Sequence, residues 1–383
     1  MSSTLKLLTD PFLQLPTPTG IHVVWFTEFA GSQHTVYYGA NLNLSTGATT
    51  TKLTRTREDQ DSQVAFPTYQ QPVSRDIWRH EAKITNLTPG VRVNYRVIST
   101  NNGTSVTSDI FTLAPLPVPN TPLKILLTSD HQIKPMVAAN LQKVTETIGK
   151  VDAVWFAGDL VNIPDRASEW FDDSRGNAFF PCLQGRGNYV MDWDGTRIAY
   201  TGGQIIQHAP MFTCIGNHEF MGRFAREGSL NKEFDDTIPR DIARKLYGKE
   251  YLKDNSFNTD TYEEIFTLPQ SETGGKTYYA TTFGDIRLVV LYATNMWRFV
   301  STEDGRKGKY GEPKDDLENP ENWGYGQIIY EPIAKGSTQY NWLEAELNSL
   351  EFQQAKYKVV MLHHPPHTLG DNIVPAYTDP VQI

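Results

Sequence analysis

Four short apolar runs in this chain each end in a cluster of polar residues, and this arrangement limits the possible folds more than any other feature. The runs cover residues 124–128, 152–157, 211–215 and 357–362. They are followed by Asp130, Gly158-Asp159, Gly216-Asn217-His218-Glu219 and His363-His364. In an α/β sheet, ligands bind in the crevice at the carboxyl ends of the strands. We therefore expect two aspartates, an asparagine and a histidine to meet at one place.

The segment after residue 123 alternates strand and helix patterns, as is typical of an α/β fold. Apolar residues recur at helical spacing over 137–148, between predicted strands at 124–128 and 152–157. Two strands with a helix between them indicate a βαβ unit. Gly284-Asp285 then predicts a two-residue hairpin turn.

The rest of this segment is less regular. A helix is predicted over 340–350, with Trp342, Leu343, Leu347 and Leu350 on one face. The stretches 162–210 and 299–336 show little periodicity, so we predict that they are long loops.

The first 114 residues lack helical periodicity and are predicted to form an all-β sandwich. Strands are expected at 21–27, 35–38, 77–84 and 91–99. Asn101-Asn102-Gly103 has the turn chemistry of a hairpin. Four prolines between residues 115 and 122 predict a stiff linker. The expected division is a sandwich over 1–114, a linker over 115–122 and an α/β domain over 123–383.

Composition excludes some classes of function. The 35 Lys and Arg against 44 Asp and Glu give a net charge of -9, which argues against general nucleic-acid binding. No run approaches the roughly 18 apolar residues of a membrane span. Residues 1–10 lack the apolar core of a signal peptide, so a cytoplasmic location is expected, although export stays open. The sequence does not indicate the oligomeric state.

The expected cluster offers oxygen and nitrogen donors that suit divalent metals. Asp159 is the natural bridging group, because one carboxylate can hold two cations. Asp130 would bind one metal, while Asn217 and His363 would bind the other. Such a pair would clamp a phosphate and lower the pKa of a bridging water, which supplies a hydroxide nucleophile.

Two histidines have roles other than metal binding in this scheme. His218 lies beside a metal-bound amide, so it could protonate the leaving alkoxide or stabilise charge on the phosphoryl oxygens. The alternative for His218 is a structural role behind the metal ligands. His364 could orient the substrate phosphate together with Asn217, or it could be a structural histidine with satisfied hydrogen bonds.

These polar clusters carry a family resemblance. In order, Asp130, Gly158-Asp159, Gly216-Asn217-His218-Glu219 and His363-His364-Pro365-Pro366 resemble the first four signature blocks of the calcineurin-like metallophosphoesterases. Pro11-Phe12-Leu13-Gln14, Val23-Val24-Trp25 and Leu87-Thr88-Pro89-Gly90 resemble the fibronectin type III-like N-terminal domain of purple acid phosphatases. The resemblance implies a four-layer α/β/β/α metallophosphoesterase sandwich after the all-β sandwich domain.

The same resemblance implies an activity and a cofactor. A dinuclear centre of divalent or trivalent Fe, Mn or Zn ions would hydrolyse a small phosphate ester. A phosphodiesterase or nucleotidase activity at the same site is the first alternative. The alternative from another class is a non-catalytic binding protein with a degenerate phosphoesterase domain.

Two positions depart from the family patterns. Purple acid phosphatases carry a tyrosine ligand three residues after the second-block aspartate, and its phenolate gives the iron its colour; here that residue is Asn162. We therefore predict a colourless protein. The wider superfamily has Asp-x-His in the first block, and Gln132 replaces that histidine. Either the Gln132 amide oxygen or the neighbouring His131 could take its place as a ligand.

A third departure concerns the end of the sequence. The family completes its metal set with a Gly-His-x-His block, which does not follow before Ile383. We expect a C-terminally truncated sequence, and a degenerate relative is the alternative. Without those histidines each metal loses a ligand, so the activity of the chain as given could be impaired.

Overall fold

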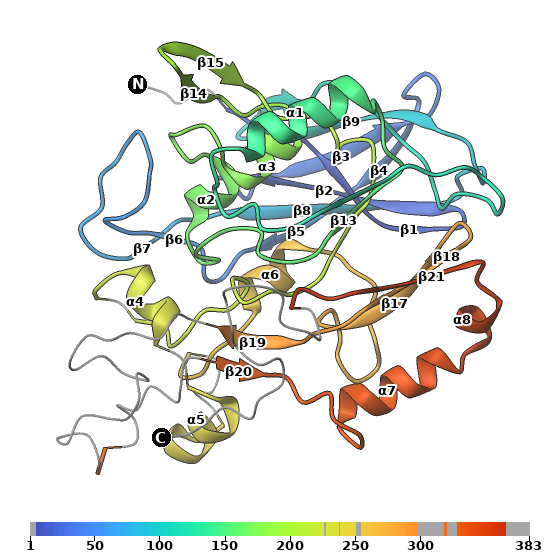
Figure 1. Cartoon of the computed structure of the whole chain (residues 1–383). Helices are drawn as coiled ribbons and strands as arrows, with labels where there is room; N and C mark the ends of the chain where they lie inside the picture. The colour runs from blue at the N-terminus through green and yellow to red at the C-terminus, as the bar shows by residue number, and fades with distance from the viewer. Residues whose placement is uncertain are drawn as a thin grey trace.

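The computed structural model describes residues 5–225, 227–236, 238–249, 254–297, 318–319 and 328–364. Its elements fall into an N-terminal all-β unit and an α/β unit (Figure 1). In the described part of the chain, no helix combines the length and the apolar character needed to cross a bilayer.

The N-terminal unit is a sandwich of two antiparallel sheets, as predicted. One sheet has the order β1 (Phe12–Thr17), β2 (Gly20–Thr27), β8 (Trp78–Ile84) and β5 (Thr49–Lys52). The other has β10 (Thr104–Thr107), β9 (Val93–Asn101), β3 (Gln33–Tyr38) and β4 (Leu44–Gly47), with β11 (Phe111–Leu113) paired to β9. Trp25, Tyr95 and Phe111 fill the core between the sheets.

The boundaries of this unit follow burial and turn chemistry. Strand β9 begins two residues later than expected, at Val93, and Val91 is 46% exposed. The predicted hairpin at Asn102-Gly103 joins β9 to β10, with Asn101 opposite Thr104. A short pair, β6 (Arg57–Glu58) and β7 (Val73–Ser74), projects from the sandwich.

The α/β unit contains two three-stranded sheets. Strands β12 (Ile125–Thr128), β13 (Ala153–Phe156) and β16 (Met211–Thr213) are parallel, and α1 (Val137–Thr147) connects the first two, which confirms the βαβ unit. The second sheet is β17 (Tyr279–Phe283), β18 (Ile286–Val290) and β21 (Tyr357–Met361), with the predicted hairpin between β17 and β18.

Helices cover both sheets, which gives the four-layer α/β/β/α architecture that the resemblance implied. Figure 1 shows α1 on one side of the unit and α7 (Thr338–Leu347) on the other. The Trp342 ring of α7 packs on Tyr278 at 4.9 Å between centroids. The remaining elements are α4 (Leu230–Asp235), α5 (Arg240–Tyr247), α6 (Asp260–Ile265), and the strand pair β19 (Thr294–Trp297) and β20 (Ile328–Tyr330).

The prediction of a long loop over 162–210 is wrong. This stretch forms α2 (Ala167–Phe171), α3 (Phe179–Leu183) and the hairpin of β14 (Tyr189–Trp193) and β15 (Thr196–Tyr200). Trp170 and Phe179 are buried and meet edge-on at 5.2 Å. Helices of five residues are too short to show periodicity, so burial of their aromatic side chains stabilises them instead. Most of 299–336 lies outside the described residues.

The prediction of one helix over 340–350 is also wrong at its C-terminal end. Helix α7 stops at Leu347, and α8 (Leu350–Gln354) begins as a separate helix. The Ser349 hydroxyl accepts a hydrogen bond from the amide of Phe352 at 3.1 Å, which caps α8. Leu350 is therefore the first residue of a new helix and is 72% exposed, so it does not share the face on which Trp342 packs.

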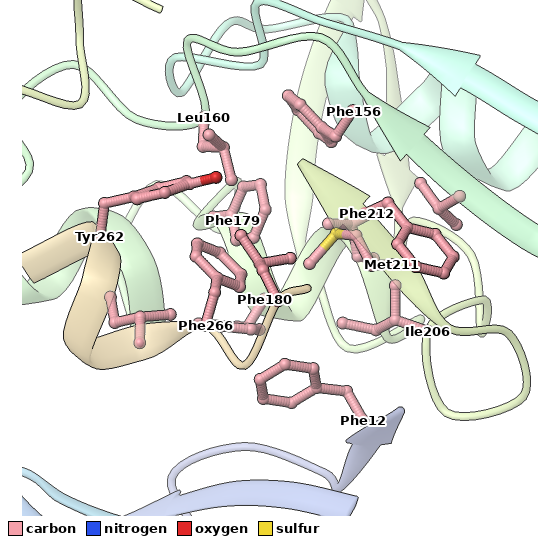
Figure 2. Packing of buried hydrophobic residues seen from close by; sticks show 14 of the residues in the cluster. Phe12, Phe156, Leu160, Phe179, Phe180, Ile206, Met211, Phe212, Tyr262 and Phe266 are labelled. Carbon is pink, nitrogen blue, oxygen red and sulfur yellow. The ribbon is translucent and has the colours of Figure 1, made fainter. Parts of the chain in front are cut away.

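The two units share one apolar interface. Figure 2 shows Phe12 of β1 beside Phe180 of α3, and their ring centroids are 5.0 Å apart. Phe26 of β2 meets Phe171 at 5.0 Å. Within the proline-rich segment, the amide of Leu116 donates to the carbonyl of Thr17 at 2.9 Å. The sandwich is thus packed directly against the α/β unit.

Candidate metal centre

Three side chains from three strand ends converge in the α/β unit. Asp130 follows β12, Asp159 follows β13 and His363 follows β21. One ligand atom from each of them lies within 4.8 Å of the other two. The Nε2 atom of His363 is 3.3 Å from Oδ2 of Asp159. Two carboxylates and an imidazole form a donor set that fits a borderline divalent metal.

The backbone is shaped to bring these side chains together. Asp130 and Asp159 have φ angles of 54° and 58°, in the left-handed region that non-glycine residues seldom adopt. Such conformations persist where the surrounding structure enforces them, as at functional sites. A Cβ on Gly216 would lie 2.3 Å from Oδ1 of Asp159, so only glycine leaves room for this carboxylate.

His363 is oriented by a second hydrogen bond. Its Nδ1 donates to the carbonyl of Ala157 at 2.7 Å, which leaves Nε2 directed at the cluster. Burial opposes the charged ring, but the hydrogen bond and charge of Asp159 raise the pKa of His363 to about 9. The same pairing outweighs burial at Asp159 and lowers its pKa to about 2. A metal bound to Nε2 would replace the proton that these two groups share.

Glu219 holds two of the strand ends together. Its Oε2 accepts the amides of Asp159 at 2.9 Å and Gly216 at 2.7 Å, and its Oε1 accepts the amide of Leu160 at 2.8 Å. Burial and the charge of Asp159 raise the pKa of Glu219 to about 8. A cation beside Asp159 would offset that charge and favour the ionised form that accepts these amides.

His218 adjoins the cluster from the side of β16. Its backbone amide donates to Oδ1 of Asp159 at 3.0 Å. Its Nδ1 donates to the carbonyl of Asn162 at 2.8 Å, and its Nε2 lies 4.0 Å from Oδ2 of Asp159. The ring also packs against Phe234 at 5.1 Å. The hydrogen bond at Nδ1 leaves Nε2 as the nitrogen nearest the site.

The structure distinguishes Gln132 from His131. The Gln132 side-chain amide donates to Oδ2 of Asp159 at 2.9 Å, so this residue borders the cluster. His131 is instead 5% exposed and packs edge-on against Phe156 at 4.5 Å, with Nε2 at 3.1 Å from the Thr128 hydroxyl. Of the two neighbours, only Gln132 lies beside Asp159.

The two candidate substrate residues also lie near the cluster. Asn217 is 4% exposed and stands between Gly216 and His218, both of which are tied to the segment around Asp159. His364 packs edge-on against His363 at 4.6 Å. Burial and the charge of His363 lower the pKa of His364 to about 4, so His364 is neutral at physiological pH.

Asn162 does not reach the cluster in the manner of a ligand. Its side-chain amide donates to the carbonyl of Gln132 at 2.8 Å, and its own carbonyl accepts from His218. Sequence reasoning gave no role to Glu219 or to Glu169, which accepts the amide of Asn162 at 2.6 Å. The available signal for Glu219 was its place at the end of the Gly216–Glu219 cluster, whereas Glu169 of α2 carried none.

Two family models match this chain. Residues 9–113 match the family model described as purple acid phosphatase, N-terminal domain, and residues 123–381 match calcineurin-like phosphoesterase. Among solved structures, purple acid phosphatase PPD1 from yellow lupin (Lupinus luteus) seeds is similar, with a TM-score of 0.54, 17% identity and 91% of this chain covered. The match spans 50% of the lupin chain, so this chain covers about half its length. At this identity the likeness concerns the fold alone.

Two further structural matches have low TM-scores and show no shared fold. Astrotactin-2, a vertebrate protein, has a TM-score of 0.17 at 10% identity and covers 36% of this chain and 26% of its own. Amylomaltase from Corynebacterium glutamicum has a TM-score of 0.17 at 10% identity, with 38% and 21% covered. None of the curated proteins compared with this chain matches it.

Proposed function

This chain belongs to the calcineurin-like phosphoesterases, and we propose that it hydrolyses small phosphate esters at a dinuclear metal centre. The observation that supports this most directly is the meeting of Asp130, Asp159 and His363 at three strand ends. Fe, Mn and Zn are the candidate metals, because carboxylate and imidazole donors suit all three.

The proposed ligands would divide between two metals. Asp159 would bridge them, Asp130 and Gln132 would hold one, and Asn217 and His363 would hold the other. The Gln132 amide would turn its oxygen toward the metal, which a side-chain amide can do by rotation. When bound, the metals would supply Lewis acidity to the phosphoryl group and lower the pKa of the attacking water.

His218 would deliver a proton to the leaving alkoxide. Its Nδ1 is committed to the carbonyl of Asn162, so Nε2 is the nitrogen that can carry this proton toward the substrate. The distance of 4.0 Å from Nε2 to Asp159 places the ring next to the group that would bridge the metals. Asn217 and His364 would hold the substrate phosphate.

The proposal is tested with the Asp159→Asn variant. Wild-type protein supplied with Fe, Mn or Zn should bind metal and hydrolyse p-nitrophenyl phosphate faster than bis-p-nitrophenyl phosphate. Because loss of a supporting group alone costs roughly 10- to 100-fold in metal affinity or activity, loss of the bridging ligand should cost at least that much. Asp285→Asn, remote from the cluster, is the matched control.

The other possible results would each support a different function. Preference for the bis ester would show a phosphodiesterase. Less than one metal per chain, together with equal rates for wild type and Asp159→Asn, would show a non-catalytic binding protein and overturn the proposal.

A further inference from the structure

We propose that Asp59, in the N-terminal sandwich unit, is a positioning residue for His218, so that the sandwich takes part in the chemistry of its neighbour. The proposal rests on the proposed function, in which His218 donates the proton to the leaving group. Asp59 follows β6 and is 1% exposed. Its carboxylate binds Arg166 and Leu230, which belong to two chain segments that contact the His218 ring.

The first connection runs through two ion pairs. Asp59 accepts hydrogen bonds from Nη2 of Arg166 at 3.1 Å, and Nη1 of Arg166 donates to Glu169 at 2.9 Å. Glu169 accepts the amide of Asn162 at 2.6 Å. The carbonyl of the same Asn162 receives Nδ1 of His218 at 2.8 Å. The position of this carbonyl therefore depends on the Asp59–Arg166–Glu169 series.

The second connection runs through helix α4. Oδ2 of Asp59 accepts the amide of Leu230, the first residue of α4, at 2.7 Å. Phe234, one turn further along that helix, packs on the His218 ring at 5.1 Å. The carbonyl that fixes Nδ1 and the aromatic ring that supports the imidazole thus share one carboxylate as their anchor.

Asp59 is itself held firmly in place. The Ser62 hydroxyl and the amide of Asp61 both donate to its Oδ1, each at 3.2 Å. Arg166 is 5% exposed, so removal of the carboxylate would leave this buried cation with Glu169 as its carboxylate partner and its charge less well balanced. A buried cation that loses one of its carboxylates shifts toward the other, and the groups around Arg166 include the Asn162 segment that supports His218.

Asp59→Asn should therefore impair proton donation more than it impairs binding. The experiment compares kcat and KM for p-nitrophenyl phosphate, whose leaving group needs little protonation, with those for an alkyl phosphate, whose alkoxide needs it. A general acid contributes roughly 100- to 10,000-fold, so a displaced one should lower alkyl phosphate kcat about tenfold. The p-nitrophenyl rate, KM and metal content should stay near wild-type values.

Asp10→Asn is the matched control. Asp10 is also a buried acid of the N-terminal unit that bonds across the interface, with Gln207 at 3.2 Å and Arg186 at 3.1 Å, but these contacts do not lead to His218. In Asp10→Asn, the ratio of the alkyl phosphate rate to the p-nitrophenyl phosphate rate should match that of the wild type. Adding Asp59→Asn to His218→Asn should leave the ratio of the single His218 variant unchanged, because both act on one proton transfer.

A second measurement tests the positioning of His218 independently of the proposed hydrolytic function. Nitrogen NMR of the zinc-loaded protein, assigned with His218→Asn, should show Nδ1 of His218 protonated in the wild type and a mixed tautomer in Asp59→Asn. If wild-type protein hydrolyses neither ester, the proposed function fails while the NMR comparison still decides the positioning. Should Asp59→Asn not fold, Arg166→Lys and Glu169→Gln test the first connection in the same way. A folded variant with wild-type rate ratios and tautomer overturns the proposal.

Discussion

Gly158 and Gly216 face each other across the ends of β13 and β16, so closely that a Cβ on Gly158 would lie 2.8 Å from the amide nitrogen of Gly216. The same Cβ would lie 2.9 Å from Nδ1 of His363. Real Cβ atoms do not approach backbone atoms at such distances. The two glycines therefore allow three strand ends to meet at the candidate metal centre, and the sequence places each directly beside a candidate ligand.

Gly216→Ala should disrupt metal binding and stability together. The new Cβ would meet Oδ1 of Asp159 and Cδ2 of His363, at 2.3 and 2.9 Å, so both side chains must move. Forcing a methyl group into a packed site typically costs about 1–3 kcal/mol. Urea unfolding measures the stability and calorimetric zinc titration the affinity. Gly47→Ala, with no heavy atom within 4 Å of the added carbon, should change neither.

Glu219→Gln should weaken the site although it replaces none of the proposed metal ligands. The glutamine has one oxygen for the three amides that Glu219 accepts, and its own N–H groups would face donors. Leaving buried donors unsatisfied costs about 1–3 kcal/mol each. Because these amides belong to Asp159 and its neighbours, zinc affinity should fall as well.

The control for this variant is Glu346→Gln. Glu346 pairs with Arg287 through both oxygens, at 2.7 and 2.8 Å, in the second sheet layer. Glu346→Gln should lower the free energy of unfolding but leave zinc affinity at its wild-type value. Equal zinc affinities for Glu219→Gln and wild type would contradict the organising role of Glu219.

The strand ends could be predicted because the signal is local. An apolar run followed at once by Asp130 or Asp159 indicates both the strand and its exposed end, and the parallel sheet then brings such ends together. Which of His131 and Gln132 lies at the site could not be predicted from the neighbouring sequence. It depends on Phe156 and Phe179, whose rings enclose His131 and leave Gln132 beside Asp159.

The contacts of Arg166 could not be predicted from the sequence either. Asp59 lies 107 positions away from it in sequence, and nothing in either neighbourhood indicates that they pair. The short helices α2 and α3 escaped prediction for a related reason, since packing of Trp170 and Phe179 stabilises them rather than any repeating pattern. Tertiary burial, which a single sequence does not display, decided these features.

Iron-loaded protein should be colourless. The colour of purple acid phosphatases arises from a tyrosinate ligand, and at the corresponding position Asn162 donates its amide to the carbonyl of Gln132. The Asn162 side chain has no phenolate, so it cannot give the charge-transfer band of a tyrosinate bound to iron. Absorption spectra of the protein with and without iron measure this directly, and a visible charge-transfer band in the purple region would refute it.

Two stacked histidines should make the N-terminal sandwich sensitive to acid. The rings of His34 and His80 lie 3.6 Å apart at 18°, with His80 fully buried. The Thr27 hydroxyl donates to the carbonyl of Phe29 and so accepts Nε2 of His80 at 2.8 Å, while Nδ1 faces the Thr50 hydroxyl at 2.9 Å. These partners are satisfied by a neutral ring.

Burial, and then the charges of His34 and Arg79, lower the pKa of His80 to about 3. Between pH 6.5 and pH 3 the unfolded chain binds a proton at this position that the folded chain does not, so stability present above pH 6.5 is lost as the pH falls. The loss should reach roughly 3 kcal/mol at pH 4.5, and urea unfolding at pH 7.0, 5.5 and 4.5 measures it. In His80→Gln, which retains a polar group for both threonines, the difference between pH 7.0 and pH 4.5 should shrink by that amount. An unchanged difference would assign the acid sensitivity to other groups, because only the titration of residue 80 distinguishes the two proteins.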